Sequence, residues 1–282
     1  MLKLIVFTKY LKGLDIERLI EVIKFVDGEG ADLCVRPGYL VEPENCSENL
    51  PEIVKNFKDA GLSIPLITTP VDFVEPDSPI TEKLFSTCGE IGIKLIKLGY
   101  WFMGKDYWET VGKIRKIIEK FVKLSEKYNV KVLIHTHSGE TMSINSASTM
   151  NLIKGFDPRY IGVFLDPGHL SLVGEPLPMA LNIVGEYLSA VAVKDFVRER
   201  VISGGKRTWE KRVVPLGEGF ADWHTLIRLL LEMKFSGPVS IHSEYSEYDL
   251  ETIIDQTRID IRYFRKVISI VQQEMAKGST NK

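Results

Sequence analysis

The stretch VKVLIHTH, residues 130–137, is an apolar run that ends on two histidines, His135 and His137. Near-continuous apolar runs of this length are typical of parallel strands, which are buried on both faces. Seven further runs of the same kind lie along the chain: LKLIVFT (2–8), ADLCVRP (31–37), SIPLITT (63–69), IKLIKLGY (93–100), IGVFLDPGH (161–169), LSAVAVKDF (188–196) and GPVSIHSEY (237–245). The sequence therefore predicts eight strands.

Helical spacing fills the segments between these runs. In residues 106–129 and 249–275, apolar side chains recur mostly at the three- and four-residue intervals of an amphipathic helix. They are Val111, Ile114, Ile118, Phe121 and Leu124 in the first segment, and Ile253, Ile259, Phe264 and Ile268 in the second. Strand and helix alternate eight times, which predicts a parallel sheet with crossover helices. A closed (β/α)8 TIM barrel of about 250 residues fits the length. The rival, an open doubly wound sheet, usually carries GxGxxG after its first strand, and FTKYLKGLD (7–15) has none.

The length and composition suit one folded domain. The chain has 282 residues, of which 44% are hydrophobic, which is enough for a sizeable core. We expect a single barrel domain over residues 1–275 and a polar tail over residues 276–282. The longest irregular segment expected covers residues 197–220, and long loops after barrel strands are more often functional than domain boundaries.

Charge and hydropathy exclude several classes of partner. The net charge is −2, so there is no basic excess to neutralise the phosphates of a nucleic acid. No apolar run approaches the ~18 residues of a membrane span, and the N-terminus lacks a secretory signal, so we expect a cytoplasmic protein without a membrane partner. The three cysteines have no CxxC spacing, which argues against a disulfide framework or a thiolate zinc site.

Ionisable side chains gather where the predicted strands end. The C-terminal strand ends of a TIM barrel surround its active site. The residues at or just beyond these ends are Arg36, Lys97, His135, His137, Asp166, His169, Lys194, Asp195, His242 and Glu244. Alternate residues of a strand share a face, so His135 and His137 point the same way, as do His242 and Glu244. The sequence thus predicts a polar cleft above an apolar barrel.

These motifs resemble those of the xylose isomerase-like barrel superfamily of sugar phosphate isomerases and epimerases. The likeness spans nearly the whole chain and is carried by IGVFLDPGHL (161–170), VAVKDF (191–196), PLGEGFADWHTLIRLL (215–230) and GPVSIHSEY (237–245). The resemblance implies a barrel with a divalent metal at its C-terminal mouth, held by Glu, Asp, His and Glu on strands five to eight. It implies carbohydrate metabolism, with proton transfer through an enediol.

Carried over by position, the resemblance assigns only one metal ligand directly, Asp166, and makes His169 the substrate-contacting histidine. The other three ligand positions depart from the pattern and hold His135, Ala192 and His242. One expectation is therefore a site of two histidines and one carboxylate, His135, Asp166 and His242, for Mn, Co, Zn, Mg or Fe. The other is a metal-free site that works by acid–base chemistry alone.

The resemblance and the residues together indicate an isomerase or epimerase acting on a sugar or sugar phosphate. We expect Glu244, Lys194 and His137 to be catalytic, and desolvation to lower the pKa of Lys194 so that it serves as a base or Schiff-base former. The side chains expected to bind substrate are His169, Arg36, Lys97 and Arg198. The alternatives are a related dehydratase or lyase, and a non-catalytic sugar-binding barrel that has lost its metal. A homo-oligomer is compatible with the sequence.

Overall fold

The computed structural model describes residues 2–280 and contains a closed barrel of eight parallel strands. In chain order the strands are β1 (Lys3–Phe7), β2 (Gly30–Cys34), β3 (Ser63–Thr68), β4 (Leu95–Lys97), β5 (Lys131–His135), β6 (Ile161–Leu165), β7 (Leu188–Val193) and β10 (Pro238–Ile241). Each lies within or within one residue of a predicted run, and β10 closes the barrel by pairing with β1. The predicted TIM barrel is therefore confirmed.

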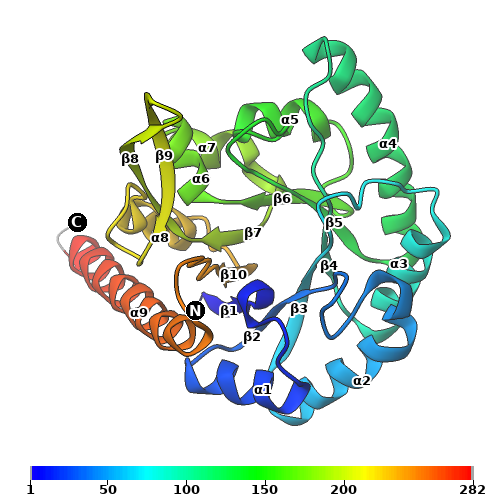
Figure 1. Cartoon of the computed structure of the whole chain (residues 1–282), viewed down its shortest axis with the longest axis horizontal. Helices are drawn as coiled ribbons and strands as arrows, with labels where there is room; N and C mark the ends of the chain where they lie inside the picture. The colour runs from blue at the N-terminus through cyan, green and yellow to red at the C-terminus, as the bar shows by residue number, and fades with distance from the viewer. Residues whose placement is uncertain (1, 281–282) are drawn as a thin grey trace.

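Helices surround the barrel on its outside (Figure 1). They are α1 (Ile16–Phe25), α2 (Cys46–Asp59), α3 (Pro79–Ile91), α4 (Tyr107–Tyr128), α5 (Ser146–Ile153), α6 (Pro167–Val173), α7 (Leu177–Val184), α8 (Trp223–Glu232) and α9 (Leu250–Thr280). None of the helices within residues 2–280 combines the length and the apolar character needed to cross a membrane.

The two helices with the clearest sequence pattern form where expected. Asp106 caps α4 by accepting a hydrogen bond from the backbone N–H of Glu109, and Asn129 ends the helix in the left-handed conformation. Helix α9 continues through residues 276–280 of the expected tail, and residues 281–282 lie outside the described part. One position in α9 was assigned wrongly: Ile259 is 57% exposed, because the buried face of α9 passes through Ile261 and Phe264 instead.

The barrel interior is filled by one small apolar layer. Its members are Ile5, Leu66, Leu133, Phe164, Ala190 and Ala192, with Leu95 packed against them. The intervening strand residues, such as Val132 and Ile134 of β5, belong instead to the large cluster between the strands and the helices. This alternation follows from the two-residue period of a strand. It means that the next inward-facing residue of each strand lies at the C-terminal mouth.

The prediction that residues 197–220 are irregular is wrong for most of this segment. It forms the antiparallel hairpin β8 (Asp195–Ser203) and β9 (Lys206–Val214), which rises from the end of β7 (Figure 1). The loop is Gly204-Gly205, and both residues have positive φ, 56° and 76°, as tight two-residue hairpin turns require. The hairpin lacks an apolar face, so hydropathy did not reveal it, although a Gly-Gly pair between two β-rich runs is a hairpin signal.

The return from the hairpin to α8 is organised by the buried carboxylate of Asp195. It accepts hydrogen bonds from the backbone N–H groups of Phe196, Gly217 and Ala221, at 3.0–3.1 Å, and from the indole N–H of Trp223 at 3.0 Å. Both oxygens are thereby saturated by structural donors. Asp195 was predicted at a strand end with the other ionisable residues, but its carboxylate fixes the loop between β9 and α8.

We predict that Asp195→Ala lowers the free energy of unfolding by about 3 kcal/mol or more, because it leaves several buried donors without an acceptor. Urea unfolding followed by circular dichroism measures the change. The matched control is Asp222→Ala, which removes an exposed cap of α8 that accepts from the Thr225 N–H and should cost only about 1 kcal/mol. Equal losses in the two variants would contradict the structural role given to Asp195.

Candidate active site

A layer of polar side chains lies directly above the apolar interior of the barrel. Each member follows an inward-facing residue by two positions: Lys97 follows Leu95, His135 follows Leu133, Asp166 follows Phe164, Lys194 follows Ala192 and His242 follows Ser240. The ring centroids of His135 and His242 are 6.1 Å apart, so strands far apart in sequence contribute to one cluster. Strand period and barrel closure together place these groups at the mouth.

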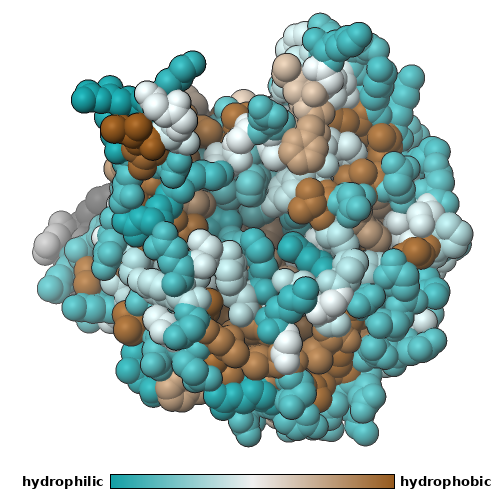
Figure 2. Space-filling view, in the orientation of Figure 1, coloured by the Kyte–Doolittle hydropathy of each residue, from teal (hydrophilic) through white to brown (hydrophobic). Residues whose placement is uncertain are grey.

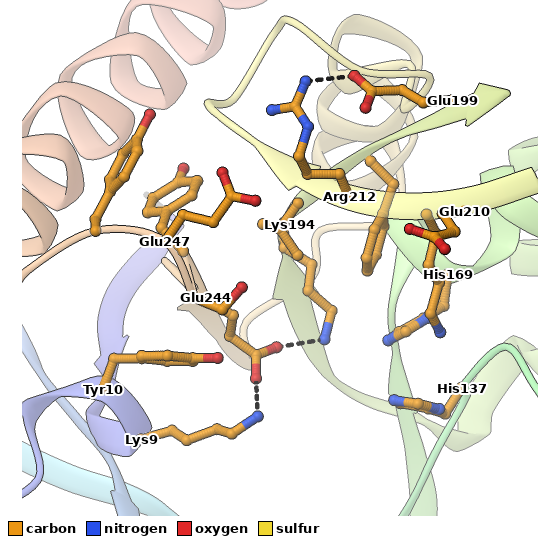
Figure 3. Close-up of a pocket in the computed structure, with 16 residues that line it drawn as sticks. Lys9, Tyr10, His137, His169, Lys194, Glu199, Glu210, Arg212, Glu244 and Glu247 are labelled. Atoms are coloured by element: carbon orange, nitrogen blue, oxygen red, sulfur yellow. Dashed lines mark hydrogen bonds and ion pairs between the residues drawn. The ribbon is translucent and has the colours of Figure 1, made fainter. Parts of the chain in front are cut away.

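The centre of this layer is an ion cluster of Lys9, Asp166, Lys194 and Glu244, here called the Lys194 cluster. The Lys194 ammonium lies 2.6 Å from Glu244 Oε2 and 3.4 Å from Asp166 Oδ2. The other oxygen of Glu244 accepts from Lys9, on the turn after β1, at 2.6 Å, so Glu244 lies between two ammonium groups (Figure 3). Lys194 and Asp166 are almost completely buried.

These ion pairs fix the charge of each member. Burial alone lowers the pKa of Lys194, but the carboxylates of Glu244 and Asp166 raise it more, and the pKa ends above its ordinary value. Burial raises the pKa of Asp166 and of Glu244, but Lys194 together with the other neighbouring donors outweighs it in both cases, and both pKa values fall below their ordinary range. Lys194 is therefore a permanent ammonium at neutral pH. The expectation of a lowered pKa for Lys194, and hence of a base or Schiff-base former there, is wrong.

The metal expected at His135, Asp166 and His242 does not fit this arrangement. Within residues 2–280, no group of three or more His, Cys, Asp or Glu side chains is placed to hold a metal ion. The Lys194 ammonium already lies against Asp166, the only anionic member of the expected ligand set, and neutralises it. A divalent cation beside Asp166 would face the repulsion of that ammonium. The residues therefore supply a positive charge of their own where the family resemblance implies a metal.

Three histidines at the mouth, His135, His137 and His169, are held in their neutral form. His135 lies between the Tyr100 hydroxyl, 2.7 Å from Nδ1, and Asp166 Oδ2, 3.2 Å from Nε2. A carboxylate only accepts, so Nε2 carries the proton and Nδ1 accepts from Tyr100. Burial lowers the pKa of both His135 and His137 to about 3, and it lowers the pKa of His169 well below its ordinary value.

His137 and His169 form a pair of imidazoles on the hairpin side of the mouth. Their ring centroids are 3.8 Å apart, and Ser138 Oγ lies 2.7 Å from Nδ1 of His169. Among the described residues, His137 Nδ1 and His169 Nε2 have no hydrogen-bond partner although both atoms are buried. Buried ring nitrogens without a protein partner are available to a ligand.

His242 occupies the opposite side of the layer, stacked on Phe7 at a centroid distance of 4.2 Å. Its ring nitrogens lie 3.6 Å from Asp32 Oδ2 and 3.7 Å from Glu244 Oε2, which is too long for a hydrogen bond. Asp32 in turn accepts from Thr68 Oγ1 and Ser240 Oγ, at 2.6 Å and 2.9 Å. The sequence analysis did not select Asp32, although a carboxylate within an apolar strand was a usable signal.

Two adjoining cavities open onto this layer and share the side chains of Lys9, His137, Lys194 and Glu244. The hairpin-side cavity, of about 410 Å³, continues along His169, Lys211 and Arg212. The Lys97 cavity, of about 270 Å³, continues along Arg36, Lys97, Tyr100, His135 and His242. The space-filling view shows the surface hollowed beside the hairpin, with hydrophilic side chains around the hollow (Figure 2). Together the cavities have the size of a small-molecule site.

The structure places nine of the ten predicted site residues in or directly beside these cavities. Arg36 donates from Nε to the Thr69 carbonyl and lines the Lys97 cavity. Arg198 is the exception, because it is exposed, donates to the carbonyl of Leu172 on α6 and lines neither cavity. Lys9 was not predicted, since it lies in a 3-10 turn (Thr8–Leu11), whereas Tyr100 belongs to the aromatic stretch GYWFMGKDYW (99–108), which the sequence allows either to wall a ligand pocket or to cap the barrel.

Comparison with known proteins places this barrel in a family. The family model described as "Xylose isomerase-like TIM barrel" matches residues 20–267, which is most of the chain. The chain belongs to the xylose isomerase-like TIM barrel family. A search of curated proteins gave no match to the sequence.

Solved structures of the same fold are distant in sequence. The 3-keto-D-glucoside 4-epimerase YcjR from E. coli aligns with a TM-score of 0.72 at 15% identity, covering 94% of this chain and 100% of that one. The probable 3-DHS dehydratase AsbF from Bacillus anthracis aligns with a TM-score of 0.65 at 16% identity, covering 93% and 98%. A xylose isomerase-like barrel from Mycobacterium smegmatis in complex with magnesium gives 0.63 at 15% identity, covering 92% and 91%. At these identities the likeness establishes the fold.

We predict that Lys194→Met lowers the free energy of unfolding at pH 7 by about 3–5 kcal/mol, because it leaves the Asp166 carboxylate buried without its ammonium. Urea unfolding at pH 7 and pH 4 measures the difference from the native chain. Asp166 and Glu244 have lowered pKa values in the folded chain, so the stability they contribute is present above their unfolded values of about 4 and is lost as pH falls.

In the variant, the buried Asp166 carboxylate has no ammonium partner and takes up a proton as pH falls, so the deficit of Lys194→Met should shrink at pH 4. Lys211→Met is the control, because Lys211 lines the same cavity from the hairpin but makes only a 3.4 Å contact with Ser138 Oγ. That variant should lose less than about 0.5 kcal/mol. A pH-independent deficit for Lys194→Met would show that the lost stability comes from packing.

Proposed function

We propose that this protein is an isomerase or epimerase for a sugar or sugar phosphate, and that it moves a proton at a carbon next to a carbonyl without a resident metal ion. One observation carries the proposal: neutral imidazoles and a permanently charged ammonium line one cavity at the mouth of a barrel of this family. Enolisation requires a proton acceptor beside the carbon and positive charge beside the oxygens.

His137 is the favoured proton carrier. Its ring stays neutral at physiological pH, and Nδ1 has no partner within residues 2–280, so it can accept a proton from substrate. The imidazolium formed is stabilised by the negative charge that develops on the substrate at the same moment. Lys194 lies in the same cavity and binds the substrate oxygen on which that charge collects.

Glu244 is the less favoured base. Both of its carboxylate oxygens already accept hydrogen bonds, one from Lys9 and one from Lys194, whereas His137 Nδ1 has no such partner in the described chain. The place of Glu244 between two ammonium groups suits it to hold Lys194 toward the cavity (Figure 3). His169 and Arg36 line the two cavities and would bind hydroxyl or phosphate groups of the substrate.

Two alternatives keep specific support. A dehydratase begins with the same proton abstraction, and the AsbF structure shares the fold. A divalent metal such as Mn, Co, Zn, Mg or Fe at His135, Asp166 and His242 would follow the family resemblance, and the Mycobacterium smegmatis barrel holds magnesium. The Lys194 ammonium beside Asp166 favours the metal-free version. A non-catalytic barrel would bind sugars without any proton exchange.

The test is exchange of substrate C–H protons with D₂O, followed by NMR over a panel of ketoses, ketose phosphates and keto-glycosides. We predict exchange that survives EDTA treatment and is not stimulated by added Mn, Co, Zn or Mg. Loss of exchange with EDTA and its return with one metal would favour the metal alternative. A product that has lost one water molecule from the substrate would identify a dehydratase. Saturable sugar binding without exchange would identify a non-catalytic sugar-binding barrel.

We predict that His137→Asn lowers the exchange rate by about 10²–10⁴-fold, the usual contribution of a general acid–base group. His224→Asn is the matched control, because His224 pairs with Glu274 on the outer surface and lies away from both cavities. Glu244→Gln tests the other base. A larger loss for Glu244→Gln than for His137→Asn would transfer the proton-carrier role to Glu244.

The exchange rate should also lack a histidine titration near pH 6.5. The pKa of His137 is lowered from 6.5 to about 3, so the neutral base persists as pH falls through 6.5, and the acid limb of the profile lies well below that value. The pH profile of kcat/KM for exchange measures this in the free enzyme. A half-maximal loss between pH 6 and 7 would contradict the neutral-imidazole assignment.

A further inference from the structure

Lys97 is a buried lysine whose amine has no hydrogen-bond or ion-pair partner in the described chain, and its Nζ lies over the ring of Tyr100. It ends β4 and faces inward, because Leu95, two residues earlier, packs on the interior cluster while Ile96 packs on the helix side. Only 1% of Lys97 is exposed, and its Nζ makes no hydrogen bond within residues 2–280. The side chain lines the Lys97 cavity, so the amine is closed to bulk water but adjoins the space that would hold a ligand.

The surroundings of this amine favour its neutral form. Burial lowers the pKa of Lys97 well below its ordinary value, and the Arg36 guanidinium lowers it further. Asp32 acts in the opposite direction, but its oxygens already accept from Thr68 and Ser240. The nearest ring is Tyr100, whose centroid is 3.7 Å from Nζ. An amine without its proton is a nucleophile.

A structural role does not account for Lys97. An unpaired polar group in an apolar site destabilises a fold, and methionine would fill the same space without that cost. Lys194, which lines the same cavity, differs from Lys97 because its ammonium pairs with two carboxylates, those of Asp166 and Glu244. The two lysines therefore differ in chemistry: Lys194 supplies a fixed charge, and Lys97 supplies a reactive nitrogen.

We propose that Lys97 is a covalent catalytic residue whose amine forms an imine with the carbonyl carbon of the substrate. The proposal rests on the proposed function in one respect, that the ligand of the mouth is a small carbonyl compound. It replaces the role expected from the sequence, in which Lys97 would hold an anion, because a neutral amine attracts no anion. The ligand class is an open-chain ketose or aldose, or its phosphate.

The step balances without any oxidant or reductant. The nitrogen of Lys97 bonds to the carbonyl carbon, and one N–H proton moves to the oxygen to give a carbinolamine. The C–O bond then breaks, and the hydroxyl leaves as water with the second N–H proton, which gives the imine. Uptake of one proton from solvent makes the iminium, which accepts the electron pair of the neighbouring C–H bond when His137 removes that proton. Water reverses the steps and restores the amine.

The residues around Lys97 suit these steps. Lys97, His137 and Lys194 line the same cavity, so a substrate bonded to Lys97 would share that space with the proposed proton carrier and the ammonium. The Tyr100 ring next to Nζ is held by its hydroxyl, which donates to His135, and His135 is held in turn by Asp166. This chain of hydrogen bonds fixes one wall of the nucleophile's site.

Reductive trapping tests the imine directly. The full-length protein is incubated with dihydroxyacetone or D-fructose and sodium borohydride, and the adducts are located by intact mass and peptide mapping. We predict one saturable adduct on Lys97. Lys131 is the internal control: burial also lowers its pKa, but it hydrogen-bonds Ser189 and lines a different pocket. Adducts spread over Lys131 and surface lysines, with none on Lys97, would overturn the proposal.

Two variants test whether Lys97 acts as a nucleophile or only as a positive charge. Lys97→Met should abolish the adduct and the D₂O exchange while leaving the melting temperature unchanged or higher, because it removes an unpaired buried amine. Lys97→Arg places a permanent cation there but cannot form an imine, so it should also lose the adduct and the exchange. Retained exchange in a folded Lys97→Arg or Lys97→Met variant would show that the amine is not a nucleophile in the reaction.

The outcomes distinguish the two proposals. Sugar exchange by the native protein without an adduct on Lys97 would overturn the imine and leave the isomerase or epimerase standing. An adduct on Lys97 with dihydroxyacetone, but no exchange on any sugar of the panel, would support the imine and overturn the sugar assignment. Absence of both would overturn both.

Discussion

The active end of this protein depends on one geometric constraint, the two-residue alternation of side chains along eight parallel strands that close into a barrel. Inward positions are apolar in the middle of the barrel and polar two residues later, so the same alternation builds the core and the reactive layer. The interior members combine large side chains, such as Phe164 and Leu133, with the small side chains of Ala190 and Ala192. A shift of one residue in any strand would send its ionisable group toward the helices instead of the mouth.

Electrostatics then divides the layer into groups with different states. Lys194 is held charged by Asp166 and Glu244, whereas Lys97, about equally buried, has no carboxylate bonded to it. Burial keeps His135, His137 and His169 neutral, and the proton positions of His135 follow from Tyr100 on one side and Asp166 on the other. A fixed cation, neutral imidazoles and a buried amine without a hydrogen bond line adjoining cavities, and this combination supports the proposed chemistry at a carbonyl group.

Much of this arrangement could be predicted from the sequence, because it depends on local patterns. The eight apolar runs, the helical spacing of residues 106–129 and the polar residues at strand ends are periodic signals, and the barrel rules place strand ends together. The hairpin of residues 195–214 was not predicted, because most of its side chains are exposed on both faces and its apolar residues do not alternate as in a half-buried strand. Arg198 was placed by its nearness in sequence to β7, but the hairpin carries it toward α6.

The sequence by itself determined the fold, the end of the barrel that holds the site and most of the residues there. Only the tertiary structure decided what each residue is in chemical terms. Whether a lysine is an ammonium or an amine depends on which carboxylates lie within a few ångströms and on how much water reaches it. The partners of Lys194 come from β6 and from the loop after β10, while Lys97 on β4 gains none. The sequence indicated that both lysines lie at strand ends. The closed barrel places carboxylates beside Lys194 but none within ion-pair distance of Lys97.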